Sequence, residues 1–126
     1  MVTPIRPNPA PYASVPTELQ QYPQWIVWRA FQRENGKLGK MPYSLHTGQE
    51  ADPNNPETWI TYAEAVQAAK QGNYDGIGFV FTEHDPFTGI DLDDCVEDGE
   101  PKTWAWDIIE QFDSYTETSP SGTGVK

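Results

Sequence analysis

Two aspartates separated by a single residue are the part of this sequence best suited to chemistry. Asp91 and Asp93 lie in the run Gly-Ile-Asp-Leu-Asp-Asp, which predicts a strand over 89–93. On a strand, alternate side chains share one face about 6.6 Å apart, and two carboxylates held there repel each other. Mg²⁺ or Mn²⁺ bound by the carboxylate oxygens would relieve that repulsion. Two such ions can activate an attacking hydroxyl and stabilise a leaving pyrophosphate. Asp91 and Asp93 are therefore candidate metal ligands and candidate catalytic residues.

Two other interpretations of this acidic run need consideration. A strand edge that carries unpaired acids to solvent is common on an acidic protein, and the pattern alone does not separate it from a metal site. A calcium loop of the EF-hand type fails, because Cys95 stands at its fifth position and Val96 at its glycine position.

A second candidate is the Ser/Gly segment near the end of the chain, Ser-Pro-Ser-Gly-Thr-Gly over 119–124. Backbone N–H groups in such a turn can converge on a phosphate, and hydroxyls add further donors. An ordinary turn or a flexible tail is the alternative, and the spacing is not that of a Walker motif. The candidate nucleotide-binding residues are Ser119, Ser121, Gly122, Thr123, Gly124 and Lys126.

The elements that must position these residues follow an α+β pattern with a mixed or antiparallel sheet. The apolar run over 76–82 predicts a central, largely buried strand, with 89–93 as its partner and Ile90 and Leu92 directed into the core. Helices are predicted over Thr17–Gln21, Thr61–Gln71 and Ala105–Phe112, and further strands over Gln24–Arg33, Leu38–Ser44 and Ser114–Thr118.

Local signals support several of these elements. Thr17 with Gln20, and Thr61 with Glu64, have the spacing of helix capping boxes. An Asn-Gly pair that ends at Gly36 predicts the turn of a β-hairpin. The hairpin brings together half of the basic residues of the chain, namely Arg29, Arg33, Lys37 and Lys40.

Composition limits the classes of protein. The length of 126 residues fits one domain, preceded by a proline-rich arm over 1–16. The net charge of -11 argues against a general nucleic-acid surface. Cys95, the single cysteine, excludes an internal disulfide, and its acidic neighbour Asp94 makes it a poor nucleophile. No run is long and apolar enough to span a membrane, and a cytoplasmic location is expected.

Taken together, the motifs resemble those of primase-polymerases of phages and plasmids, which belong to the archaeo-eukaryotic primase superfamily. The resemblance extends over 17–126 and depends on the order of five segments rather than on any one of them. These are Pro23–Trp28, Gly39–Tyr43, Asp75–Val80, Gly89–Asp93 and Ser119–Gly124.

The resemblance implies an RRM-like sheet with flanking helices, as part of an archaeo-eukaryotic primase-type catalytic core. Asp91 and Asp93 match the metal-binding acid pair of the family, and the segment from Ser119 matches its phosphate-binding motif. Lys126 stands where that motif often has a histidine. A third acid is expected beyond Lys126, so 17–126 is predicted to be the N-terminal portion of a domain truncated at its C-terminus.

The function implied is that of a DNA primase or polymerase in the replication of a phage, plasmid or other mobile element. The reaction would be metal-dependent nucleotidyl transfer, with nucleoside triphosphates and a DNA template and primer as partners, and with a fused or associated helicase in the parent protein. The alternatives are a non-catalytic module that binds nucleotide, nucleic acid or a replication partner, and an acidic interaction or inhibitor protein that docks through Glu97, Asp98 and Glu100.

Overall fold

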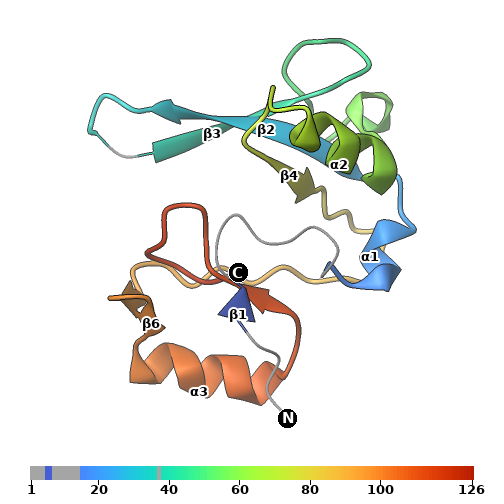
Figure 1. Ribbon diagram of the computed structural model, residues 1–126. Helices are drawn as coiled ribbons and strands as arrows, with labels where there is room; N and C mark the ends of the chain where they lie inside the picture. Colours follow the sequence, from blue (N-terminus) through green and yellow to red (C-terminus); the bar gives the residue numbers. More distant parts are fainter. Residues whose placement is uncertain (1–4, 7–14, 37) are drawn as a thin grey trace. The chain divides into compact units, whose positions relative to one another are not determined.

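A computed structural model describes residues 5–6, 15–36 and 38–126 of the chain. These residues form two compact units (Figure 1). The first unit, called here the sheet unit, runs from Pro16 to Pro86. The second, called the loop unit, comprises the described residues 5–6 and 15 together with Phe87–Lys126.

The sheet unit is built on three antiparallel strands. β2 (Trp25–Gln32) lies between β3 (Leu38–Tyr43) and β4 (Gly76–Phe79). The predicted hairpin is confirmed: the N–H of Gly36, whose φ is +80°, donates to the carbonyl of Arg33 over 2.9 Å. Glycine suits this turn because it adopts positive φ without a steric cost.

Three helical segments complete the sheet unit, namely α1 (Thr17–Gln20), the 3-10 turn η2 (Pro56–Thr58) and α2 (Tyr62–Lys70). The helices predicted here are confirmed to within a residue at each end. The capping box at Thr61 forms with both of its hydrogen bonds, whereas the one predicted at Thr17 is wrong. There Pro16 takes the N-cap position, and Thr17 is already the first helical residue.

Helix α2 packs on β2 and β4 and buries the apolar face of the sheet (Figure 1). Trp25 and Val27 alternate along β2 on this face and are 3% and 0% exposed. The Trp25 ring meets Tyr62 of α2 edge to face at 5.0 Å between centroids. Ala65 and Ala68 are the buried residues of the helix. Small residues at these positions allow helix and sheet to approach closely.

The predictions for the next two strands need correction. The strand predicted over 76–82 ends at Phe79 and lies at an edge of the sheet, because β2 takes the central position. The segment 89–93 does not pair with it and has no regular strand; Leu92 alone forms a bridge, to Val125. Ile90, expected in the core, is 37% exposed. The hydrophobic pattern identified the apolar residues of this segment. It could not identify the residues that pair with them, because these lie far away in the sequence.

The loop unit has one long helix, α3 (Thr103–Phe112), which confirms the third predicted helix. A small hairpin precedes it, made of β5 (Val96–Glu97) and β6 (Glu100–Pro101). After the helix, β7 (Thr116–Glu117) confirms the predicted final strand, and it pairs in parallel with β1 (Ile5–Arg6) from the proline-rich arm. The rest of the predicted arm, except for 15–16, lies outside the described residues.

A small core holds the loop unit together. Cys95, Ala105, Ile109 and Val125 are buried in one cluster, and Leu92 packs against it. Two antiparallel sheets, one parallel strand pair and the flanking helices confirm the α+β class. Among the helices that the structure describes, none is long and apolar enough to cross a membrane.

Candidate functional site

The acid pair lies on an exposed stretch of the loop unit. Asp91 and Asp93 flank Leu92, and both are exposed while Leu92 packs inward on the core cluster. The backbone turns immediately afterwards at Asp94, whose φ is +51°. Leu92 therefore anchors the segment and leaves both neighbouring carboxylates in solvent, where they keep the hydration that a buried pair would lose.

The Ser/Gly segment forms a closed turn, as predicted. Ser119 and Gly124 lie at its base and are buried, whereas Ser121, Gly122 and Thr123 form its exposed tip. The N–H of Ser119 donates to the carbonyl of Gly124 over 2.9 Å and closes the turn. Gly122 has a φ of +78°, a backbone conformation that L-residues with a side chain seldom adopt.

Backbone pairing joins the loop directly to the acid segment. Leu92 and Val125 exchange two backbone hydrogen bonds of 2.8 Å each. The N–H groups of Cys95 and Val96 both donate to the carbonyl of Thr123, over 2.9 and 3.0 Å. The sequence segments around 92 and 123 are therefore neighbours in the fold, and candidate metal ligands and candidate phosphate donors come from one compact unit.

Gly124 is the point of closest approach between the two segments. A Cβ atom at this position would lie 2.7 Å from the carbonyl oxygen of Leu92 and 3.3 Å from Oγ of Ser119. Only glycine lets the two backbones meet at this distance. This role was not predicted, since an isolated glycine in a Ser/Gly run gives no sign of which backbone it will face.

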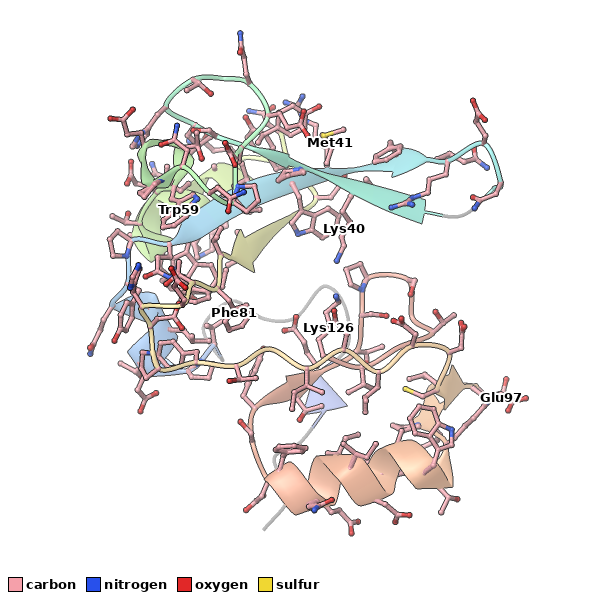
Figure 2. The ribbon with its side chains drawn as sticks, turned by 180° about the vertical axis from the view of Figure 1, so that it is seen from behind. Lys40, Met41, Trp59, Phe81, Glu97 and Lys126 are labelled. Carbon is pink, nitrogen blue, oxygen red and sulfur yellow. The ribbon has the colours of Figure 1, made fainter. Side chains whose placement is uncertain are left out.

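The last residue of the segment links the two candidate groups electrostatically. Nζ of Lys126 lies 3.1 Å from Oδ1 of Asp91, with side chains 38% and 66% exposed (Figure 2). The backbone of Lys126 exchanges hydrogen bonds of 2.9 Å with Glu117 of β7, which holds the lysine in line with the strand. An exposed ion pair of this kind contributes roughly 0–1 kcal/mol to stability. The lysine can therefore leave Asp91 for a more highly charged anion at little cost in free energy.

The loop already satisfies most of its own donors. The N–H groups of Gly122 and Gly124 donate to the carbonyl and to Oγ of Ser119, over 2.9 and 3.0 Å. The hydroxyls form a chain from Ser119 through Ser121 to Thr123, with both oxygen–oxygen distances 2.9 Å. This chain ends at the exposed tip, where hydroxyl protons can turn outward toward an anion without a change in the backbone.

The donor set fits a hard divalent cation held loosely. Asp91 and Asp93 supply carboxylate oxygens, which Mg²⁺ and Mn²⁺ prefer, and their exposure leaves room for water in the remaining positions. Within the described part of the chain, no group of three or more His, Cys, Asp or Glu side chains could hold a metal. The two aspartates thus provide a partial ligand set.

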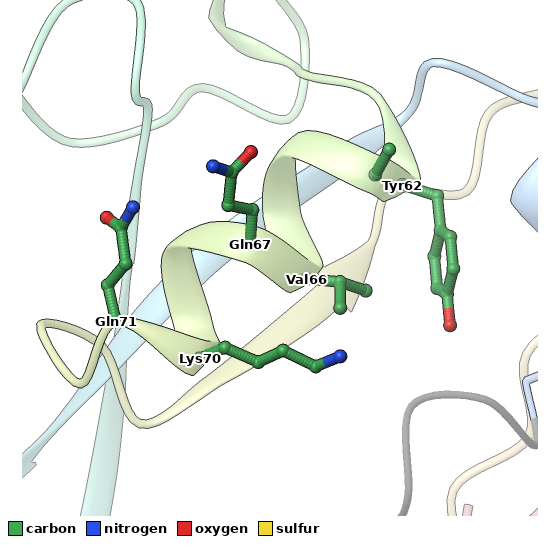
Figure 3. A pocket seen from close by; sticks show the side chains of 6 residues that line it. Tyr62, Val66, Gln67, Lys70 and Gln71 are labelled. Carbon is green, nitrogen blue, oxygen red and sulfur yellow. The ribbon is translucent and has the colours of Figure 1, made fainter.

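Other reactive or concave features lie away from these residues. Cys95 is fully buried, and desolvation raises the pKa of its thiol, so it is unsuited to be a nucleophile. His46 and His84 are exposed. A shallow pocket on α2 of the sheet unit is lined by Tyr62, Val66, Lys70 and their helical neighbours (Figure 3), and it contains none of the predicted site residues.

Comparison with known proteins identifies a relative of this chain. No model of a known protein family matches the chain. A DNA primase-polymerase of Nitratiruptor phage NrS-1 is 35% identical over 109 residues, which cover 85% of this chain and 14% of the phage protein. The chain is therefore related to a phage primase-polymerase, and it spans about one seventh of the length of that relative.

Proposed function

We propose that this chain is the part of a DNA primase-polymerase that binds the triphosphate of an incoming nucleotide together with a divalent cation. The observation that carries the proposal is the pairing of Leu92 with Val125, because it brings the acid pair and the Ser/Gly loop into one unit. The similarity to the phage DNA primase-polymerase supports the same reaction class.

Each candidate residue has a distinct part in this proposal. Ser121 and Thr123 would donate hydroxyl hydrogen bonds to phosphate oxygens from the exposed tip of the loop. Lys126 would leave Asp91 and neutralise part of the triphosphate charge. Gly122 and Gly124 would keep the loop in shape, the first through its positive φ and the second through its contact with Leu92.

Asp91 and Asp93 would hold Mg²⁺ or Mn²⁺ through their exposed carboxylates. Held by these two residues, the cation would supply positive charge for the triphosphate and for the leaving pyrophosphate. It would also weaken the Lys126–Asp91 pair, since the cation competes for the same carboxylate. The lysine would then be available to the nucleotide when the metal is present.

Manganese binding tests the metal part of the proposal. Paramagnetic broadening of amide signals around residue 91 should appear at low Mn²⁺ in the wild-type chain and be lost in Asp91→Asn/Asp93→Asn. A control variant, Asp107→Asn/Glu110→Gln, removes two exposed acids from α3 in the same unit and should broaden like the wild type. Equal broadening in all three proteins would show that the ion is attracted by the general negative charge alone.

A further inference from the structure

Lys126 lies in the middle of a small three-stranded arrangement that carries the candidate site. Val125 forms antiparallel bridges to Leu92 on one side and to Thr118 on the other, and Val125 and Leu92 both pack in the core cluster. Side chains alternate between the two faces of extended segments. The residues next to these three therefore share the opposite face, called here the acidic face. Its charged members are Asp91, Asp93, Glu117 and Lys126.

The lysine has an acid on each side of it across the acidic face. Its backbone exchanges two hydrogen bonds of 2.9 Å with Glu117, and directly opposite residues of an antiparallel pair have neighbouring side chains. Nζ of Lys126 nevertheless pairs with Asp91, at 3.1 Å. Among the ion pairs of the described residues, none joins Lys126 to Glu117. Something other than strand pairing therefore decides which of the two acids holds the lysine.

A tyrosine hydroxyl accounts for this choice. Tyr115 lies two residues before Glu117 on the same side of the strand, and its hydroxyl donates to Oε2 of Glu117 over 2.7 Å. Both side chains are partly buried. A hydrogen bond to a carboxylate is about twice as strong as one between neutral groups. Because Glu117 already accepts this bond, it gains less than Asp91 from turning toward the ammonium of Lys126.

The choice of acid matters for the function proposed above. A cation that takes the carboxylate of Asp91 also releases a lysine that is paired with Asp91, so the positive charge becomes available to the triphosphate. A lysine held by Glu117 would stay paired when the cation binds. The partner of Lys126 thus decides whether cation binding and release of the lysine occur together.

We propose that Tyr115 is a positioning residue for the nucleotide site and that it acts through Glu117. By holding the Glu117 carboxylate, the hydroxyl keeps that acid from capturing Lys126 and leaves the lysine on Asp91, where the cation displaces it. The inference rests on the proposed function for its effect on nucleotide binding. The placement of the lysine itself can be measured without nucleotide or metal.

The first test follows the Cε signal of Lys126 by NMR in metal-free buffer. In the wild-type background, Asp91→Asn should shift this signal and Glu117→Gln should leave it in place. In the Tyr115→Phe background the lysine should have moved, so Glu117→Gln should give the larger shift. Glu110→Gln removes the same charge from an exposed position of α3 and should leave the signal unchanged in both backgrounds. A response to Asp91→Asn alone in both backgrounds would overturn the proposal.

The second test is calorimetry with a deoxynucleoside triphosphate and Mg²⁺. Tyr115→Phe should weaken binding by about two- to fivefold, the cost of breaking one cross-strand charge pair to free the lysine. Tyr115→Phe/Glu117→Gln should restore at least the wild-type affinity, because the competing acid is gone. Two controls isolate the effect: Tyr74→Phe removes a phenol from the sheet unit and should bind like the wild type, and Tyr115→Phe/Glu110→Gln should show no rescue.

Rescue separates positioning from a purely structural role. If Tyr115 served only to brace the strand, Glu117→Gln would not restore the affinity lost in Tyr115→Phe, and that result would overturn the proposal. Unchanged affinity in Tyr115→Phe would overturn it as well, while nucleotide binding by the wild type would leave the proposed function in place. If the wild type binds no nucleotide, the proposed function fails, and the NMR comparison still decides where Tyr115 places the lysine. Circular dichroism should show that all variants are folded.

Discussion

A matched pair of glycines allows the loop to be tested separately from the stability of the fold. Gly122 at the tip of the Ser/Gly loop has a φ of +78°, and Gly99 in the β5–β6 turn has a φ of +79°. Both belong to the loop unit, and a Cβ at either position would meet no atom within 4 Å. Valine at either site therefore introduces the same backbone strain without a steric clash.

The magnitude follows from that strain. A residue with a side chain costs about 1–2 kcal/mol in the left-handed region, and β-branching adds stiffness. Gly122→Val and Gly99→Val should each lower the free energy of unfolding by about this amount. In Gly122→Val the same strain opposes the binding-competent loop, so the affinity for a nucleoside triphosphate should fall about 5- to 30-fold.

Two measurements on the same preparations separate the effects. Thermal unfolding by circular dichroism should give similar losses for both variants, and calorimetry with a deoxynucleoside triphosphate and Mg²⁺ should give weaker binding for Gly122→Val alone. Equal affinity in the two variants, whether both weak or both unchanged, would refute the assignment of the loop as the phosphate site.

Three further predictions concern the acid pair, the helix cap and the cysteine. Asp91→Asn/Asp93→Asn should change the unfolding free energy by less than about 1 kcal/mol in metal-free buffer, because its exposed ion pair is worth little; a larger loss in chemical denaturation would indicate a structural role. Thr61→Ala should lower the free energy of unfolding by about 1 kcal/mol, whereas Thr17→Ala should lower it little, since Thr17 makes no cap bond. Equal losses of melting temperature in the two variants would contradict this difference. Cys95 should react with a thiol reagent only on unfolding, and rapid labelling of the native protein would be the opposing result. Burial raises the pKa of this thiol, so its contribution to stability should decline as pH rises above the usual thiol pKa of about 9.

The cap at α2 also has a pH dependence with a defined sign. The backbone N–H and the hydroxyl of Thr61 lower the pKa of Glu64. A carboxyl whose folded pKa is depressed contributes stability above its unfolded pKa, and that contribution is lost as pH falls through the folded value. Because Glu64 is exposed, the difference between the wild type and Glu64→Gln should be small, and it should disappear in acid.

Local signals in the sequence predicted the elements whose causes are themselves local. The Asn-Gly turn, the capping box at Thr61 and the apolar spacing of α3 all correspond to elements in the structure. The capping box at Thr17 did not form, because proline at the preceding position is itself the N-cap. The Asp98-Gly99 turn between β5 and β6 carries an equally local signal, with both residues at positive φ, and it was not predicted.

The pairing of strands depended on contacts between distant segments, which no local pattern contains. The apolar residues of 89–93 were predicted to pair with β4, yet Leu92 pairs with Val125 instead. The individual site candidates could be selected by residue type and by resemblance to primase-polymerases. The close approach of the two site segments at Gly124 could not be predicted in the same way, since it depends on which backbone lies opposite that glycine in the folded unit.

The central claim is that the acid pair and the Ser/Gly loop together bind a nucleoside triphosphate with a divalent cation. Calorimetry with a deoxynucleoside triphosphate, with and without Mg²⁺, tests it most directly on the wild type and on Asp91→Asn/Asp93→Asn. We expect binding that requires Mg²⁺, is tighter for the triphosphate than for the monophosphate, and is abolished in the double variant. This chain by itself should not extend a primer at a normal rate, because its two aspartates are a partial ligand set. Absence of binding at millimolar nucleotide, or equal binding without Mg²⁺ and in the double variant, would contradict the claim.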